Sequence, residues 1–284
     1  MSYSLLDSGD QYKLERFGEY VLARPCAQAV WRPVLPEHIW KSADAHFSRD
    51  QGNRWSTIRS LPDSWNTTLH GLKFKIVPTD FGHVGLFPEH SSQWEWMEAL
   101  IQNMPQTAPP QVLNLFAYTG GATLAAARSG ASVCHLDASR SAVAWARENA
   151  ERNALTDKPI RWIIEDVAKF LQREVRRGVR YEGIVLDPPS FGRGRQGEVF
   201  VIERDLQELL QLVRQVLCDR PLFVIFTSHT PGFTPLVLHY LLQQVLQGLG
   251  GNLETGEMTL PVLQEKGNSI LPVPSGSFAR WKGL

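Results

Sequence analysis

An acid followed by two prolines marks the most chemically suggestive stretch of the chain, Val185 to Gly192 (VLDPPSFG). The apolar run before it, Tyr181 to Leu186, is typical of a buried strand, and proline ends such a strand because it has no N–H group for the sheet. The Asp187 carboxylate and the Pro188 carbonyl then lie at a strand's carboxyl end, where open α/β sheets bind ligands. Two such acceptors suit holding an N–H group while its nitrogen is alkylated. The alternative is an Asp-Pro-Pro turn with a purely structural role.

Three nearby side chains are candidates for the site, and two of them have an alternative interpretation. Ser190 follows the prolines and offers a further hydrogen bond. Phe191 either stacks on a planar acceptor or belongs to the core. His229, in the segment FTSHTPGF, either takes a proton or fills a loop.

Glycines and arginines alternate after the motif. This composition predicts a mobile loop that grips phosphate or another anion, or else a solvated loop without a ligand. The arginines concerned are Arg193, Arg195 and Arg204, and the glycines are Gly192, Gly194 and Gly197.

The elements that must position these groups begin with the first βα turn, Asn114 to Ala122, which contains Phe116-Ala117-Tyr118-Thr119-Gly120-Gly121 and overlaps the end of the apolar run Val112 to Tyr118. Glycines let a backbone pass close to a ligand, and the following helix N-terminus offers unpaired N–H groups. The turn is neither a dinucleotide G-x-G-x-x-G motif nor a P-loop.

Acids end the next two predicted strands. Asp137, followed by Ala138, suits the two hydroxyls of a ribose. Asp166 suits an adenine amino group, and the N–H of Val167 suits a ring nitrogen. Each acid is alternatively the N-cap of the next helix. Together with the turn and Asp187, however, they describe S-adenosylmethionine bound across the sheet with its methyl group directed at Asp187.

Strands and helices alternate regularly from about residue 112, which predicts a doubly wound, mostly parallel, Rossmann-like α/β sheet. Two final strands without a helix between them predict a terminal antiparallel hairpin. The predicted strands are 112–118, 132–136, 160–164, 181–186, 222–227, 253–262 and 278–282; the predicted helices are 91–104, 122–129, 140–154, 167–177, 205–218 and 235–249.

Residues 1–90 differ from the remainder, 91–284, and we expect them to form a small β-rich domain. The alternating run Leu72 to Ile76, a turn, and the run His83 to Phe87 predict a hairpin at its end. Tryptophans are concentrated in this region. They form either a base-stacking platform or the core of a small domain.

Composition limits the classes of function. The net charge is +0, so the overall composition lacks the excess of basic residues typical of nucleic-acid-binding proteins. The chain contains no run of 18 apolar residues, so we expect no membrane-spanning helix. The three cysteines lack CxxC spacing, which suits free thiols in the cytoplasm. The eight histidines show no metal-ligand spacing, so we expect no metal.

In the segments NLFAYTGGATLAAA, LDASRSAVAWARENAERNAL, EDVAKFL, VLDPPSFGRG and FTSHTPGF, the chain resembles the class I S-adenosylmethionine-dependent methyltransferases. Within them it is similar to the bacterial 23S ribosomal RNA methyltransferases that modify cytosine C5 or guanine N7. The resemblance implies a seven-stranded methyltransferase sheet, with cofactor contacts near Phe116 to Gly121, Asp137, Asp166 and Asp187. It also implies an RNA substrate.

Departures from the family pattern narrow the chemistry. Cytosine-C5 enzymes need a cysteine nucleophile, but its usual places hold Ser190 and Ser228-His229 here. A family aspartate before the first turn is Asn114, and Glu89 replaces another in the preceding hairpin. We therefore expect the protein to methylate a nucleobase nitrogen in RNA, with Asp187, Pro188 and Ser190 as the catalytic residues that hold the acceptor. The alternatives are a protein or small-molecule acceptor, or a cofactor-binding module without catalysis. The sequence does not predict the oligomeric state.

Overall fold

The computed structural model describes residues 2–49, 52–104, 108–194, 197–262 and 270–284. Their contacts separate the chain into two compact units. The first comprises Met1–Ser91 and Thr259–Ser275, and the second Ser92–Met258 and Gly276–Leu284. The C-terminal segment of the first unit was not anticipated from the sequence, which assigned everything after residue 90 to one domain.

The second unit is built on one seven-stranded sheet with the order β10-β9-β8-β11-β14-β16-β15. The strands β10, β9, β8, β11 and β14 run parallel, whereas β16 is antiparallel to β14. The predicted doubly wound, mostly parallel sheet of seven strands is therefore confirmed. Its strands are β8 (Gln111–Leu115), β9 (Ser132–Asp137), β10 (Ile160–Ile164), β11 (Gly183–Leu186), β14 (Phe223–Ser228), β15 (Gly251–Thr259) and β16 (Pro274–Gly283).

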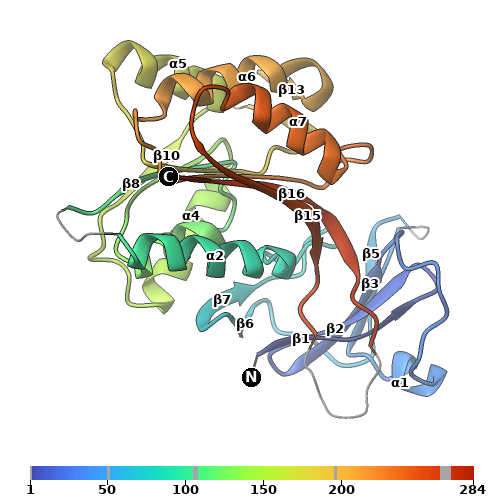
Figure 1. Ribbon diagram of the computed structural model, residues 1–284. Coiled ribbons are helices and arrows are strands. Elements are labelled where there is room, and N and C mark those ends of the chain that lie inside the picture. Colours follow the sequence, from blue (N-terminus) through green and yellow to red (C-terminus); the bar gives the residue numbers. More distant parts are fainter. Residues whose placement is uncertain (1, 50–51, 105–107, 195–196, 263–269) are drawn as a thin grey trace. The chain divides into compact units, whose positions relative to one another are not determined.

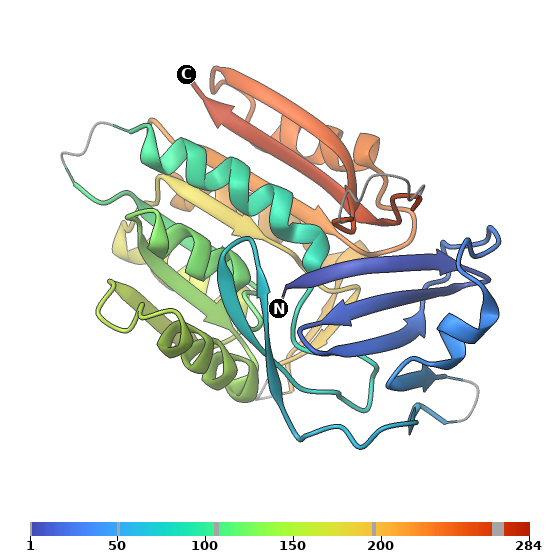
Figure 2. The same ribbon diagram turned by 90° about the horizontal axis from the view of Figure 1, so that it is seen from below.

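Helices cover both faces of this sheet, since each parallel strand needs a crossover connection to the next. Figure 1 shows α5, α6 and α7 on one face and α2 and α4 on the other. Figure 2 shows the terminal strands β15 and β16 side by side at one edge. The helices are α2 (Ser91–Gln102), α3 (Gly121–Arg128), α4 (Arg140–Arg152), α5 (Val167–Arg177), α6 (Ile202–Val216) and α7 (Pro235–Val245).

The central strands are buried on both faces. All four residues of β11 and all six of β14 are buried, as expected for parallel strands between two helical layers. The two prolines that follow β11 at Asp187 end the strand as predicted. This places the acid at the sheet edge instead of within the core.

The first unit is β-rich, as predicted. Its main sheet has the order β1-β2-β3-β4-β5, and β6 and β7 form a separate two-stranded sheet. The core is apolar and includes the fully buried Phe17, Phe47 and Phe74. The elements are β1 (Tyr3–Gly9), β2 (Tyr12–Phe17), β3 (Tyr20–Pro25), α1 (Glu37–Lys41), β4 (Ala45–Ser48), β5 (Arg54–Thr57), β6 (Trp65–Leu69), β7 (Leu72–Ile76) and the 3-10 turn η1 (Pro88–His90).

The tryptophans of this unit have structural roles. The indole N–H groups of Trp31, Trp55 and Trp65 donate to the backbone oxygens of Ser8, Thr79 and Phe17, at 3.0, 2.9 and 2.7 Å. Trp40 donates to the buried carboxylate of Asp7 at 3.0 Å. All four side chains are half-buried. These contacts favour the packing interpretation over a stacking platform.

Two local predictions are wrong. The partner of β7 is β6 and not the run 83–87, which forms no strand. Within that run, the carbonyls of His83 and Val84 accept the N–H groups of Thr79 and Val77, at 2.9 and 3.1 Å. The glycine-arginine stretch is not an open loop either: Phe191–Arg193 (β12) and Val199–Val201 (β13) pair as an antiparallel hairpin. Arg195 lies outside the described residues.

Among the described residues, none of the helices has the length and hydropathy required for a transmembrane span. All three cysteines are free thiols.

Candidate active site

The carboxyl ends of the parallel strands lie level with one another. Leu115 of β8 is in register with Leu136 of β9 and with Leu186 of β11, which in turn is in register with Phe226 of β14. The residues directly after these positions therefore meet at one sheet edge. They include the predicted Phe116, Asp137 and Asp187, and also Thr227.

The turn after β8 has an unusual backbone. Phe116 and Tyr118 have positive φ angles of 55° and 48°, a conformation that side-chain-bearing residues rarely adopt. The Ala117 N–H donates to the Leu136 carbonyl at 3.0 Å, and the Gly120 N–H returns to the Ala117 carbonyl at 3.0 Å. Strain of this kind concentrates at ligand-binding sites. The turn has the backbone expected where a chain passes close to a ligand.

The two glycines of this turn are required for different reasons. Gly120 has φ +91°, and a Cβ there would lie 3.1 Å from the Ala146 Cβ. At Gly121, an added Cβ would lie 2.3 Å from the ring of Trp94. Gly121 is thus fixed by packing of α3 against α2, a reason that the sequence did not reveal.

Asp137 organises the turn from the end of β9. Its Oδ2 accepts the Tyr118 N–H at 2.9 Å, and its Oδ1 accepts the Ser139 N–H at 2.8 Å. Ser139 is the N-cap of α4, which excludes the capping interpretation of Asp137. Burial raises the pKa of Asp137, whereas the N–H groups of Ser139 and Tyr118 oppose that shift. A carboxylate has about four acceptor sites, so both oxygens can still accept hydroxyl groups.

Behind the turn lies a buried polar chain. The Asn114 Nδ2 donates to Thr123 Oγ1 at 2.9 Å, and that hydroxyl lies 2.9 Å from His135 Nδ1. Asn114 thus connects β8 to α3 through its side chain. Burial, with a smaller effect of Arg147, lowers the pKa of His135 from 6.5 to about 3.

His135 should therefore make the protein less stable in mild acid. The unfolded chain protonates this imidazole below about pH 6.5 but the folded chain does not, so its contribution to the free energy of unfolding is full above pH 6.5 and declines toward pH 3. His135→Gln removes the titrating group. Between pH 7.5 and 5, chemical denaturation should show the wild type losing about 2 kcal/mol more than this variant. Equal losses would contradict a neutral buried imidazole.

Asp166 caps α5, as its structural interpretation predicted. Its Oδ1 accepts the Lys169 N–H at 3.0 Å. It also lines a cavity of about 210 Å³, together with Phe116 and Val167. This cavity is smaller than a drug-sized pocket of about 300–1,000 Å³ and has the scale of one heteroaromatic ring system. Its other lining residues are Ala168, Glu198, Val199, Phe200, Asp205, Glu208 and Leu209.

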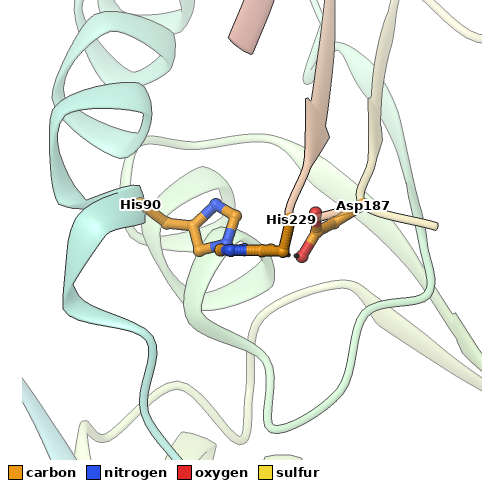
Figure 3. Close-up of side chains that lie close together, drawn as sticks. All are labelled: His90, Asp187 and His229. Atoms are coloured by element: carbon orange, nitrogen blue, oxygen red, sulfur yellow. Dashed lines mark ion pairs between the residues drawn. The ribbon is translucent and has the colours of Figure 1, made fainter. Parts of the chain in front are cut away.

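Asp187 has defined partners at the end of β11. Thr227 donates its hydroxyl to Asp187 Oδ1 at 2.8 Å, and His229 Nε2 lies 3.7 Å from Asp187 Oδ2. Figure 3 shows the imidazole of His229 beside this carboxylate; the figure also draws His90, a residue of the first unit. The side chains of Asp187 and His229 keep 29% and 35% of their surface exposed, so a ligand and water can both reach them.

The residues after the prolines are accessible. Ser190 Oγ lies 2.7 Å from Thr230 Oγ1, which ties the motif to the end of β14. Phe191 is 53% exposed and is therefore not a core residue. Its ring lies 5.7 Å from the Arg193 guanidinium. Arg204 is paired with Asp205, so it is not dedicated to an external anion.

Sequence reasoning missed several residues at this edge. Thr227 and Thr230 contact Asp187 and Ser190, respectively, but single threonines at a strand end carry no motif. Phe200 lines the cavity from the β12–β13 hairpin, which the glycines in the sequence led us to predict as a loop.

Cys134 does not have the properties of a catalytic nucleophile. Burial raises the pKa of its thiol to about 11, whereas an activated cysteine has a lowered pKa.

The turn, Asp137 and the cavity have features that an adenosyl cofactor would require: a turn with positive φ angles, a carboxylate at a strand end that accepts two backbone N–H groups, and a cavity of about 210 Å³. Comparison with known proteins agrees. A family model described as S-adenosylmethionine-dependent methyltransferase matches residues 28–238. The crystal structure of an S-adenosylmethionine-dependent methyltransferase from Agrobacterium tumefaciens is 40% identical, covers 99% of this chain and 90% of that chain, and superposes with a TM-score of 0.93.

Two further matches show less: one covers only half of this chain, and the other shares its fold at low sequence identity. The ribosomal RNA large subunit methyltransferase K/L of Pseudomonas aeruginosa is 39% identical over 143 residues, which are 50% of this chain and 18% of that protein. The chain thus spans about a fifth of the length of the curated relatives it matches. A Streptococcus mutans structure described as an S-adenosylmethionine-dependent methyltransferase shares the fold at 17% identity, with a TM-score of 0.74 and coverage of 99% of this chain and 75% of that one. From the family match and the Agrobacterium structure together, the chain belongs to the S-adenosylmethionine-dependent methyltransferases.

Proposed function

We propose that this methyltransferase transfers the methyl group to a nitrogen of a nucleobase in RNA. The observation that carries the proposal is the Asp187 carboxylate, held by Thr227 beside the exposed Ser190 and Phe191 at the edge where the cofactor turn also lies. The similarity to ribosomal RNA methyltransferases over half of the chain supports an RNA substrate.

The cofactor would lie along the strand ends. We assign its adenine to the cavity at Asp166 and Val167, its ribose to Asp137 with Ala138 beside it, and its amino-acid end to the turn Phe116–Gly121. Bound S-adenosylmethionine supplies a methyl group made electrophilic by a sulfonium. The protein's contribution is to align an acceptor and to stabilise charge, because a direct displacement needs little else.

Asp187 and the Pro188 carbonyl hold the acceptor by its N–H hydrogens. Thr227 holds the Oδ1 atom of the carboxylate, and Oδ2 lies 3.7 Å from His229 Nε2. Ser190 adds a hydrogen bond from a position fixed by Thr230. The exposed ring of Phe191 offers a stacking surface for a planar base.

His229 receives the proton that the acceptor nitrogen releases. We expect His229→Asn to lower the turnover number about 100-fold, as for loss of a positioned proton acceptor, with cofactor affinity unchanged. His239→Asn, a change on α7 far along the chain from the motif, is the matched control and should keep wild-type turnover. Equal turnover in the two variants would leave His229 as a loop residue only.

Residues 1–90 and 91–284 are proposed as the two domains, with the chemistry confined to the second. The segment Thr259–Ser275 groups with the first by its contacts. Here Leu5 forms a bridge with Val262.

The function is tested by incubating the protein with methyl-labelled S-adenosylmethionine and, in separate reactions, unmodified ribosomal RNA, total protein extract or a small-molecule extract. Label is expected in RNA, and nuclease digestion should release it as an N-methylated nucleoside. Label in protein or in small molecules would favour the second candidate, which the neutral charge of the chain supports. Label in none of them, with cofactor binding intact, would favour a binding module.

A further inference from the structure

The hairpin β12–β13 begins at the proposed acceptor site. Phe191 pairs with Val201, Gly192 with Phe200 and Arg193 with Val199. The Ile202 N–H donates to the Ser190 carbonyl at 3.1 Å and closes the base of the hairpin. The end of the hairpin nearest the motif is thus held in place at Ser190, the residue after the Asp-Pro-Pro sequence.

The other end of the hairpin is attached to α5. The Gly194 N–H donates to the Glu198 carbonyl at 2.8 Å, and the Glu198 carboxylate forms an ion pair with Lys169. A Cβ at Gly194 would lie 2.4 Å from Glu198 Oε2, so this glycine leaves room for the carboxylate. Lys169 also donates its backbone N–H to Asp166, the acid assigned to adenine. The ion pair therefore joins the hairpin to the first turn of the helix that lines the cavity.

The hairpin contributes one aliphatic and one aromatic side chain to the lining of the cavity. Val199 and Phe200 line the cavity together with Asp166 and Val167 of α5. The Phe200 ring contacts the Phe116 ring, with centroids 5.4 Å apart. Phe116 is the strained first residue of the cofactor turn. Aromatic and aliphatic side chains with a few acids at the rim suit a flat, electron-rich heterocycle that carries an amino group.

From these contacts we infer that the β12–β13 hairpin is a clamp on the adenine of the cofactor, with Phe200 as the stacking wall and Lys169–Glu198 as the attachment. The inference extends the cofactor placement proposed above. It makes Phe200, Glu198 and Lys169 cofactor-positioning residues. Because the same hairpin starts at Ser190, ordering it against adenine also fixes the backbone of the acceptor site. Cofactor binding should therefore precede acceptor binding.

Calorimetry with two non-reactive probes tests the clamp. The probes are S-adenosylhomocysteine and 5′-methylthioadenosine, which keeps the adenosine but lacks the amino-acid end. Phe200→Ala should weaken both probes about 10-fold, since one buried aromatic contact is lost. Tyr240→Ala, which removes an exposed aromatic ring from α7, is the control and should bind both probes as the wild type does.

The attachment gives a smaller, separate effect. Lys169 is about half exposed, so its ion pair contributes little, and Lys169→Ala or Glu198→Ala should weaken either probe about threefold at most. The double variant should lose no more than one single variant, and exchanging the two charges should restore part of the affinity.

A measurement on the wild-type protein tests the clamp without depending on whether the variants fold correctly. Amide hydrogen exchange across Val199–Val201 should slow when S-adenosylhomocysteine binds. Unchanged exchange there would contradict the clamp, and so would binding of the probes to Phe200→Ala within twofold of the wild-type affinity. Binding of S-adenosylhomocysteine to the wild type would still support the cofactor site in either case. Failure of the proposed RNA methylation appears separately, in the labelling reaction, and does not enter this comparison.

Discussion

Asp187→Ala should reduce the turnover number about 1,000-fold while S-adenosylmethionine binds within about threefold of its wild-type affinity. In the proposed mechanism the carboxylate is the charged acceptor that holds the attacking nitrogen, and loss of one preorganised polar group at a reacting centre costs about 10²- to 10³-fold. The cofactor assignments at Asp137, Asp166 and the turn do not depend on this side chain. Single-turnover rates with labelled cofactor, combined with calorimetry, separate the two effects.

Two further variants sharpen this prediction. Asp187→Asn keeps the shape, and the Thr227 hydroxyl can accept from the new amide as readily as it donates to the carboxylate, so the fold should be intact and the loss of rate almost as large. Asp219→Ala removes an exposed acid from the segment before β14, at the opposite end of the strand, and should leave turnover unchanged. A wild-type rate in Asp187→Asn would show that no negative charge is needed at this position.

The sheet of the second unit could be predicted because its signals are local and repeated. Runs such as FVIFTS in β14 are too apolar for anything but burial on both faces, and the amphipathic segments between them have helical spacing. Prolines after β11 fixed the strand end within one residue. Alternation of this kind constrains topology strongly, since parallel strands require crossovers of one hand.

The errors concern hairpins, where composition alone did not identify the strand partner or the turn. The run 83–87 has strand composition, but its predicted partner β7 pairs with β6 on the other side, a choice decided by the turn His70-Gly71. The glycines between Phe191 and Val201 were interpreted as flexibility. In the structure Gly194 makes room for the Glu198 carboxylate, which depends on an ion pair with α5 and therefore on tertiary contacts.

Only those site residues whose positions follow directly from the end of a strand could be predicted from the sequence. Asp137 and Asp187 lie at the same sheet edge because β9 and β11 flank β8 in register. Which backbone groups Asp137 accepts, and that Thr227 fixes Asp187, depend on strained turns and side-chain directions that no spacing encodes. Capping offers the clearest case: both acids were candidates for an N-cap, yet Ser139 caps α4 whereas Asp166 caps α5.

Asp137→Ala should weaken S-adenosylmethionine binding at least about 100-fold. Hydrogen bonds to a charged group contribute about 1.5–3 kcal/mol each, and two ribose hydroxyls bonded to one carboxylate would together exceed the roughly 2.7 kcal/mol that a hundredfold change requires. The variant also releases the N–H groups of Tyr118 and Ser139, so the strained turn loses its support. Calorimetry with S-adenosylhomocysteine measures the loss without any reaction.

Asp137→Asn is the decisive companion, because it is not conservative here. Both carboxylate oxygens accept backbone N–H groups, so an amide must direct its own NH₂ at one of these donors. We therefore expect Asn to be nearly as damaging as Ala at this position, in contrast to an ordinary ribose-binding acid whose isosteric amide keeps one good acceptor. Asp157→Ala, an exposed acid before β10 at the other end of the sheet, should bind normally. If Asp137→Asn also bound normally, neither the ribose contact nor the support of the turn would need the charge, and the cofactor placement along these strand ends would be wrong.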